Sequence, residues 1–168
     1  MKKVLISGSW RYQNPDLEAQ VRQVVRDILA QDAGIISGGA LGVDYWALDE
    51  ALQLDPQATR IQIFLPSPFN FYKKYYKQRA LEKIISTTQY KTLIAKLKQL
   101  KKANPAALIE TKGVTNLNQK AYFERNSKEV YHADEMIAFQ VNGSAGTQDT
   151  IDKAKRKGIS VQVRQFEL

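Results

Sequence analysis

Three glycine-bearing turns are the places where this chain could do chemistry. They read Ser7-Gly8-Ser9, Ser37-Gly38-Gly39-Ala40-Leu41-Gly42 and Asn142-Gly143-Ser144-Ala145-Gly146-Thr147. Each follows a short apolar run and precedes a stretch whose apolar residues recur at helical spacing. Glycine lets the backbone approach a ligand closely, and the helix that follows offers free N–H groups and the positive end of its dipole to a phosphate. Although any one of them could be a tight turn only, the three together predict phosphate or nucleotide binding.

Several side chains beside these turns could contact such a ligand. Trp10 and Arg11 follow the first turn, where the indole could stack on a base and the guanidinium could reach a phosphate. Packing and solvent exposure are the alternative for both. Asp44 follows the second turn and is either a helix cap or a contact to a ribose hydroxyl. Ser144 and Thr147 add hydroxyl donors to the third turn.

The composition and the motif spacing exclude several kinds of site. The chain has no cysteine, which excludes disulfides and cysteine–zinc sites. Its single histidine, His132, cannot build a histidine-rich metal site, so we expect no metal and no cofactor. There is no G-x-x-x-x-G-K-[ST], and Gly8 stands alone after the first apolar run. These absences disfavour a Walker-type nucleotidase and a conventional dinucleotide dehydrogenase.

The turns need a scaffold that brings them together, and the order of the apolar patterns supplies one. Short apolar runs alternate with helical spacing, which predicts a Rossmann-like α/β fold with a mostly parallel sheet and helices on both faces. In such a sheet the turns emerge at the carboxyl edge, where ligands bind. We expect a single domain over residues 1–168. The expected strands are 2–6, 35–36, 61–65, 136–139 and 160–163, and the expected helices are 14–33, 43–54, 120–132 and 148–157.

Residues 66–118 form a basic, helical elaboration within this domain. Ten basic residues and one acid lie between Lys73 and Lys102, a net charge of +9 against +8 for the whole chain, so the remainder carries −1. Aromatic residues and lysines interleave over 69–77, which suits single-stranded nucleic acid through stacking and phosphate attraction. We favour instead an amphipathic helix whose aromatics dock on the core. Because the segment follows the third strand, its aromatics could also line the ligand pocket.

The apolar run Val4-Leu5-Ile6 is too short for a signal peptide or a membrane span. We therefore expect a cytoplasmic protein without a membrane partner.

The order of the three turns resembles the SLOG superfamily. This group gathers the LONELY GUY phosphoribohydrolases, the Rossmann domain of the DNA-processing protein DprA and many small nucleotide-binding proteins. The resemblance covers the chain up to Leu65 and again from about Tyr122, but not the lysine-rich middle. It implies a Rossmann-like fold, a nucleotide or nucleotide-derived small molecule as ligand, and a homo-oligomer.

One stretch is similar to the LONELY GUY enzymes, which hydrolyse the N-glycosidic bond of nucleoside 5′-monophosphates. Glu124-Arg125-Asn126 matches their E-R-[KN] segment, and the third turn with Gln148-Asp149 matches P-G-G-x-G-T-x-E. The likeness implies catalytic roles for Arg125, which could hold a phosphate, and for Asp149, whose carboxylate could stabilise an oxocarbenium-like state. The proline of the motif is absent, Ser144 replaces its second glycine, and Asp149 is one methylene shorter than glutamate. The resemblance to the LONELY GUY enzymes therefore supports the phosphate-binding turn better than it supports their catalytic activity.

Three functions follow from these residues. The first is binding of a nucleotide or nucleotide-derived phosphate ligand, as a sensor, carrier or processing module. The alternatives are a nucleoside 5′-monophosphate phosphoribohydrolase and single-stranded DNA binding, in the manner of DprA, through Lys73–Lys102. The ligand-binding residues that we expect are Gly8, Ser9, Trp10, Arg11, Gly38, Gly39, Ala40, Asp44, Arg125, Asn126, Gly143, Ser144, Gly146 and Thr147.

Overall fold

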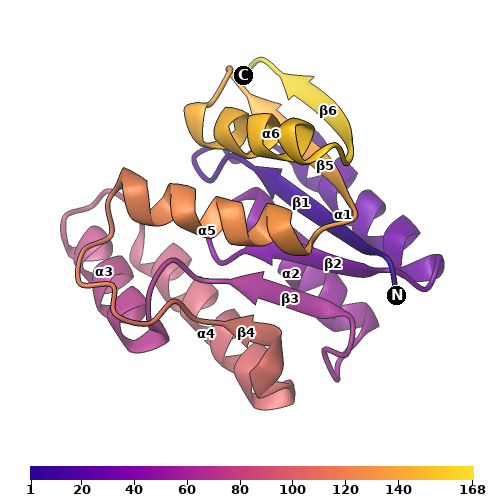
Figure 1. The fold of residues 1–168 in the computed structure, drawn as a ribbon. Helices are drawn as coiled ribbons and strands as arrows, with labels where there is room; N and C mark the ends of the chain where they lie inside the picture. The colour runs from indigo at the N-terminus through magenta and orange to yellow at the C-terminus, as the bar shows by residue number, and fades with distance from the viewer.

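Strands and helices alternate along the chain in the computed structural model, which describes residues 1–168 (Figure 1). None of the helices combines the length and the apolar composition that crossing a membrane requires. The elements are β1 (Lys3–Gly8), α1 (Pro15–Ala30), β2 (Gly34–Gly38), α2 (Val43–Leu54), β3 (Ile61–Phe64), α3 (Phe69–Leu81), α4 (Thr87–Ala103), the 3₁₀ turn η1 (Pro105–Ala107), β4 (Leu108–Ile109), α5 (Gln119–His132), β5 (Glu135–Val141), α6 (Ala145–Lys157) and β6 (Ser160–Phe166).

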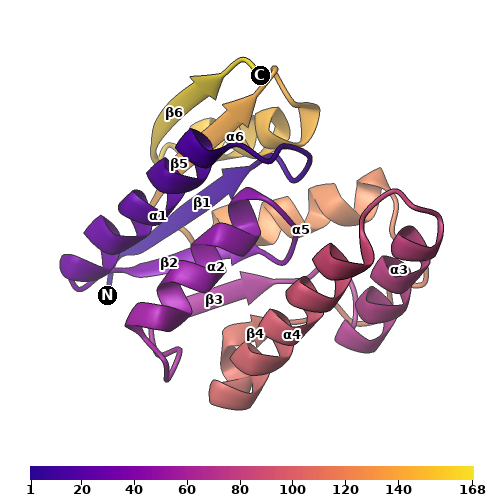
Figure 2. The ribbon, with the colours of Figure 1, turned by 180° about the vertical axis from the view of Figure 1, so that it is seen from behind.

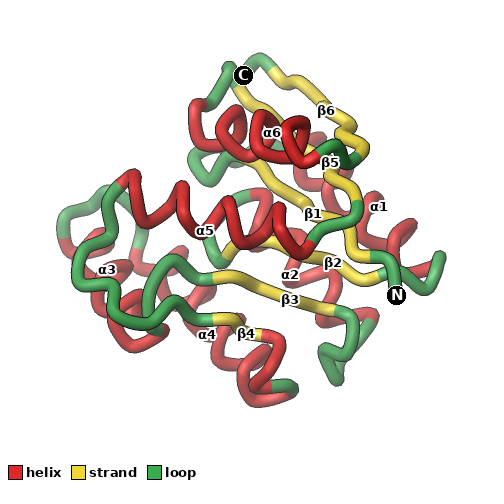
Figure 3. The backbone as a smooth tube through the Cα atoms, viewed as in Figure 1, coloured by secondary structure: helices red, strands yellow, loops and turns green.

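The six strands form one sheet in the order β4-β3-β2-β1-β5-β6, and every neighbouring pair is parallel. The Rossmann-like fold expected from the sequence is confirmed. The strand order reverses between β1 and β5, where Ser7 pairs with Ala138. The chain leaves β1, β2 and β3 at one edge of the sheet (Figure 3). In open α/β sheets, a ligand crevice forms at this edge beside the point of reversal.

Helices cover both faces of the sheet unequally. Helices α1, α2 and α4 lie on one face (Figure 2), whereas α5 and α6 lie on the other (Figure 1). Alternate strand residues point to opposite faces: Val4 and Ile6 belong to the larger core cluster, of 35 residues, whereas Leu5 belongs to a cluster of nine. The nine-residue apolar cluster lies beneath α5 and α6. Near the carboxyl edge, this face of the sheet carries polar side chains instead.

Local signals set the helix boundaries. The Asn14 side chain accepts a hydrogen bond from the Leu17 N–H at 2.9 Å, and Pro15 begins α1. Helix α4 begins with a capping box between Ser86 and Gln89. At the other end of the chain, Gly158 ends α6 in the left-handed conformation, with φ at 83°.

The middle segment contains more structure than the sequence predicted. Residues 69–81 and 87–103 form two separate helices, and the amphipathic helix expected over 69–77 is confirmed as part of α3. Strand β4 was not predicted, because two residues are too few to show an alternating pattern; it pairs with β3 and extends the sheet.

The third glycine turn is shorter than expected. Strand β5 continues to Val141, and α6 begins at Ala145 rather than near residue 148. The segment Ala145-Gly146-Thr147 is therefore the first turn of a helix, not the end of a loop.

Candidate functional site

A cavity of about 660 Å³ opens at the carboxyl edge of the sheet. It is bordered by residues 7–12 at and after the end of β1, by residues 141–147 from the end of β5 into α6, and by side chains of α3 and α5. It therefore lies beside the reversal of strand order, and its volume falls within the range of small-molecule sites.

The start of α6 forms one wall of this cavity. Asn142 and Gly143 both have positive φ, 49° and 61°, and turn the chain from β5 into the helix. No atom lies within 4 Å of a Cβ placed on Gly143 or Gly146, so the backbone is uncovered there. Ser144 makes no side-chain capping bond to the helix, and its hydroxyl donates instead to Thr147 Oγ1 at 2.8 Å. The first turn of α6 thus borders the cavity with its N–H groups uncapped.

The turn after β1 forms the adjoining wall. A Cβ on Gly8 would lie 2.8 Å from the Phe139 carbonyl oxygen and 2.5 Å from Val43 Cγ2, so glycine is needed here for the close packing of β1, β5 and α2. The Asn142 amide donates to the Tyr12 hydroxyl at 3.0 Å, which ties the turn after β1 to the turn after β5.

The second glycine turn serves the site indirectly. Of its residues, only Ala40 borders the cavity. A Cβ on Gly38 would overlap the Arg125 guanidinium, and one on Gly39 would overlap the Leu65 side chain. The Gly39 carbonyl also accepts a hydrogen bond from the Tyr72 hydroxyl at 2.8 Å. Gly38 and Gly39 therefore leave room for neighbouring side chains rather than for a ligand.

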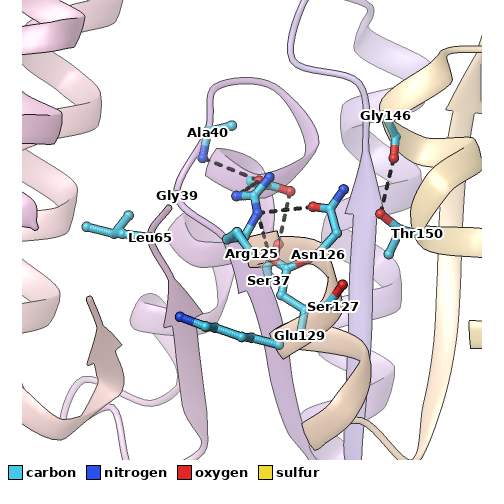
Figure 4. Close-up of polar contacts among 12 residues, drawn as sticks. Ser37, Gly39, Ala40, Leu65, Arg125, Asn126, Ser127, Glu129, Gly146 and Thr150 are labelled. Atoms are coloured by element: carbon cyan, nitrogen blue, oxygen red, sulfur yellow. Dashed lines mark hydrogen bonds and ion pairs between the residues drawn. The ribbon is translucent and has the colours of Figure 1, made fainter. Parts of the chain in front are cut away.

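Arg125 on α5 lies over Gly38, between two carboxylates, with only 11% of its side chain exposed (Figure 4). Its Nη1 is 3.9 Å from Asp44 Oδ2, and its Nε is 3.3 Å from Glu129 Oε1. The Nε–H donates to Asn126 Oδ1 at 3.1 Å. Asp44 in turn accepts hydrogen bonds from the Ser37 hydroxyl at 3.1 Å and from the Ala40 N–H at 3.3 Å.

Burial controls the charge of this group. It raises the pKa of Glu129 to about 8 and raises the pKa of Asp44, in both cases against the opposing effect of Arg125. Burial also raises the pKa of the neighbouring Tyr76 to about 12. The floor of the cavity thus combines one guanidinium with two carboxyl groups that burial makes harder to ionise.

Asp149, the second residue with an expected catalytic role, does not border the cavity. Its Oδ2 lies 2.6 Å from Lys153 Nζ and accepts a hydrogen bond from the Asn126 amide at 3.1 Å. The carboxylate therefore joins α6 to α5, with Asn126 between it and Arg125.

The structure brings together most of the residues expected from the sequence. Gly38, Gly39 and Asp149 stand apart from the cavity. The other expected residues border it: Gly8, Ser9, Trp10, Arg11, Ala40, Asp44, Arg125, Asn126, Gly143, Ser144, Gly146 and Thr147.

Sequence reasoning missed part of the wall that α3 and α5 supply. Tyr75 and Tyr76 border the cavity, as the interpretation of residues 69–77 allowed, but Arg79 and Tyr122 were not predicted. Glu129 also borders the cavity and was not predicted. Tyr122 and Glu129 could have been placed on the inner side of α5 from the apolar residues that mark its buried face. These are Ala121, Val130 and the following Ala133.

Two substitutions should distinguish a glycine that makes room for a side chain, Gly38, from one that borders open space, Gly146. We expect Gly38→Ala to lower the free energy of unfolding by about 1–3 kcal/mol, because the new methyl group displaces the Arg125 guanidinium from a packed position. Gly146→Ala has open space and removes a helix glycine, so it should raise stability by about 0.5–1 kcal/mol. Urea denaturation measures both; equal effects of the two substitutions would contradict this assignment.

A pH series should reveal the buried carboxyl of Glu129. Its pKa rises from 4.5 to about 8 on folding, so the stability that the bound proton contributes is complete below pH 4.5 and is lost as the pH rises to about 8. Glutamine does not titrate. Relative to the wild type, Glu129→Gln should therefore gain at least about 2 kcal/mol of stability between pH 5 and pH 8. Glu124→Gln, on the exposed side of α5, is the control and should show no such trend.

Comparison with known proteins supports the fold and no more than the fold. No protein-family model matches the chain, and no curated protein matches it. Among solved structures, it is similar to DNA processing protein A from Helicobacter pylori, described for its single-stranded DNA binding mode, with a TM-score of 0.70 and 21% identity over 96% of this chain. This chain spans 64% of the length of that protein.

Two further structures are similar to the chain. TM1055 matches with a TM-score of 0.56 and 16% identity, over 96% of this chain and 72% of its own. DNA processing protein A (DprA) from Streptococcus pneumoniae matches with a TM-score of 0.50 and 14% identity, over 95% of this chain and 58% of its own. The chain thus has the Rossmann-like fold of the DprA structures, as the resemblance to the SLOG superfamily implied.

Proposed function

We propose that this protein binds a nucleotide or a nucleotide-derived phosphate ligand in the cavity, as a sensor, carrier or processing module. The observation that carries the proposal is the first turn of α6, which borders the cavity with uncapped N–H groups and with Gly143 and Gly146 uncovered. A helix start of this kind combines hydrogen-bond donors with the positive end of a dipole, and both stabilise a phosphate.

The walls formed by the turn after β1 and by α3 suit the rest of a nucleotide. The Arg11 guanidinium lies 5.2 Å from the Trp10 ring, and the Arg79 guanidinium lies 5.5 Å from the Tyr75 ring. All four residues border the cavity. Aromatic rings and guanidinium planes stack on bases, and the two arginines add positive charge that attracts an anionic ligand.

The hydrolase alternative lacks a carboxylate in the expected place. Asp149 is paired with Lys153 at 2.6 Å and does not border the cavity. A carboxylate that activates water must lie within hydrogen-bond reach of the reacting atoms. The carboxylate that the motif assigns to catalysis is thus engaged elsewhere, and we propose binding before hydrolysis.

Single-stranded DNA binding is also weaker as a proposal. The Helicobacter protein is described for that activity, but it shares only a fold with this chain. Within the basic segment, Lys96 pairs with Asp49 at 2.8 Å and Lys101 pairs with Glu110 at 3.0 Å. These contacts reduce the charge that is free to meet a phosphate backbone. A steep loss of DNA affinity with rising salt would favour this function instead.

A carboxylate at the start of α6 should block phosphate binding without damaging the helix. Gly146→Asp places negative charge where the dipole stabilises it, so the fold should keep its stability or gain up to about 1 kcal/mol. The same charge repels a phosphate, and we expect nucleotide affinity to fall by at least about tenfold. Isothermal titration with nucleoside monophosphates measures the change.

The matched control is Thr88→Asp, the second residue of α4, which is exposed and does not border the cavity. This variant should bind the same nucleotides as the wild type. Equal losses in the two variants, or no loss in Gly146→Asp, would contradict the phosphate position.

Asp149→Asn should leave nucleotide affinity within about twofold of the wild type, because the carboxylate lies behind Asn126 and outside the cavity. Mass spectrometry of the same mixtures should show no free base with either protein. Release of base by the wild type that disappears in Asp149→Asn would replace the binding proposal with the phosphoribohydrolase.

A further inference from the structure

The buried guanidinium of Arg125 leaves most of its hydrogen-bonding capacity unused. Arginine carries five N–H donors, but in Arg125 only Nε donates a hydrogen bond, to Asn126 at 3.1 Å. Its Nη1 has no hydrogen-bond partner although it is screened from solvent, and the same is true of Glu129 Oε1. Only one other buried side-chain atom of the protein, Gln62 Oε1, lacks a partner. Buried polar atoms without partners are rare in folded proteins, and two neighbouring ones that border a cavity point to a ligand group.

The charges around Arg125 exclude a phosphate as that group. Asp44 and Glu129 already lie 3.9 Å and 3.3 Å from the guanidinium. A phosphate placed here would bring further negative charge next to two carboxyl groups whose pKa values burial already raises. The ligand group that meets Arg125 is therefore neutral, and the phosphate belongs at the start of α6.

The hydrogen-bonding chemistry of the two unpartnered groups selects a hydroxyl. The ligand group has to accept a hydrogen bond from Arg125 Nη1 and exchange one with Glu129 Oε1, on two side chains whose Nε and Oε1 atoms lie 3.3 Å apart. A single oxygen that both accepts and donates meets this condition, and a hydroxyl is the smallest group that provides it. In a 5′-nucleotide the hydroxyls belong to the sugar that adjoins the phosphate, and α5 borders the cavity beside α6, joined to it through Asn126 and Asp149.

We propose that Arg125 and Glu129 bind a ribose hydroxyl of the nucleotide, so that the site selects ribonucleotides over deoxyribonucleotides. This inference rests on the proposed function. Because neither Nη1 nor Oε1 is exposed in this structure, contact requires a small rotation of both side chains toward the cavity. A deoxy ligand leaves the two groups unsatisfied and loses affinity for that reason.

The first arm of the test uses the wild-type protein alone. Isothermal titration compares the 5′-monophosphates of adenosine, guanosine, cytidine and uridine with their 2′-deoxy counterparts, together with 3′-deoxyadenosine 5′-monophosphate. We expect removal of the 2′ or the 3′ hydroxyl to weaken binding by at least about tenfold. Equal affinity for ribo-, 2′-deoxy and 3′-deoxy forms would overturn the inference and leave nucleotide binding intact. No binding of any of them would overturn both.

The second arm assigns the preference to residues. Glu129→Met fills a similar volume without a polar atom and should bind ribo- and deoxynucleotides alike, whereas Glu129→Gln keeps a donor and an acceptor and should retain the preference. Glu124→Met, on the exposed side of α5, should behave as the wild type does. Full discrimination in a folded Glu129→Met variant would assign the hydroxyl to other residues and overturn the proposal.

Discussion

The burial of one arginine between two carboxyl groups is the constraint on which the candidate site depends. Arg125 can occupy its position only because Gly38 has no side chain beneath it, and hydrogen bonds from Ser37 and Ala40 hold the Asp44 carboxylate that faces it. Charges taken out of water are costly unless they are paired. The second glycine turn, α2 and α5 must therefore assemble as a unit, and the unit forms the floor of the cavity.

Much of the fold could be predicted from the sequence, because the patterns that specify it are local. The alternation of strands and helices is indicated by the caps at Asn14 and Gly158 and by the apolar runs of β1, β2 and β3. Strand β4 could not be predicted, since its two residues form a strand only through pairing with β3. The start of α6 was placed too late because a glycine next to a serine indicates a turn more strongly than a helix.

The candidate site was predictable where backbone chemistry specifies it and not where tertiary packing does. Gly143, Gly146 and Thr147 lie beside the cavity because the turn itself forms that wall. Gly38 and Gly39 have the same residue type but accommodate Arg125 and Leu65, a difference that appears only when α5 and β3 are in place. Asp149 was matched by motif position, yet its nearest partners are Lys153 and Asn126, from its own helix and its neighbour.

The reversal of strand order has a consequence for the order of assembly. One wall of the cavity follows β1 and the other follows β5, and the two strands pair between residues more than 130 positions apart, such as Ser7 and Ala138. Bringing residues of this sequence separation together costs loop-closure entropy, which the contacts between the two strands must offset. The cavity thus exists only when β1 and β5 are paired. A ligand in the cavity would contact both the first and the last portions of the chain. Because it binds only the folded state, it would stabilise that state by mass action.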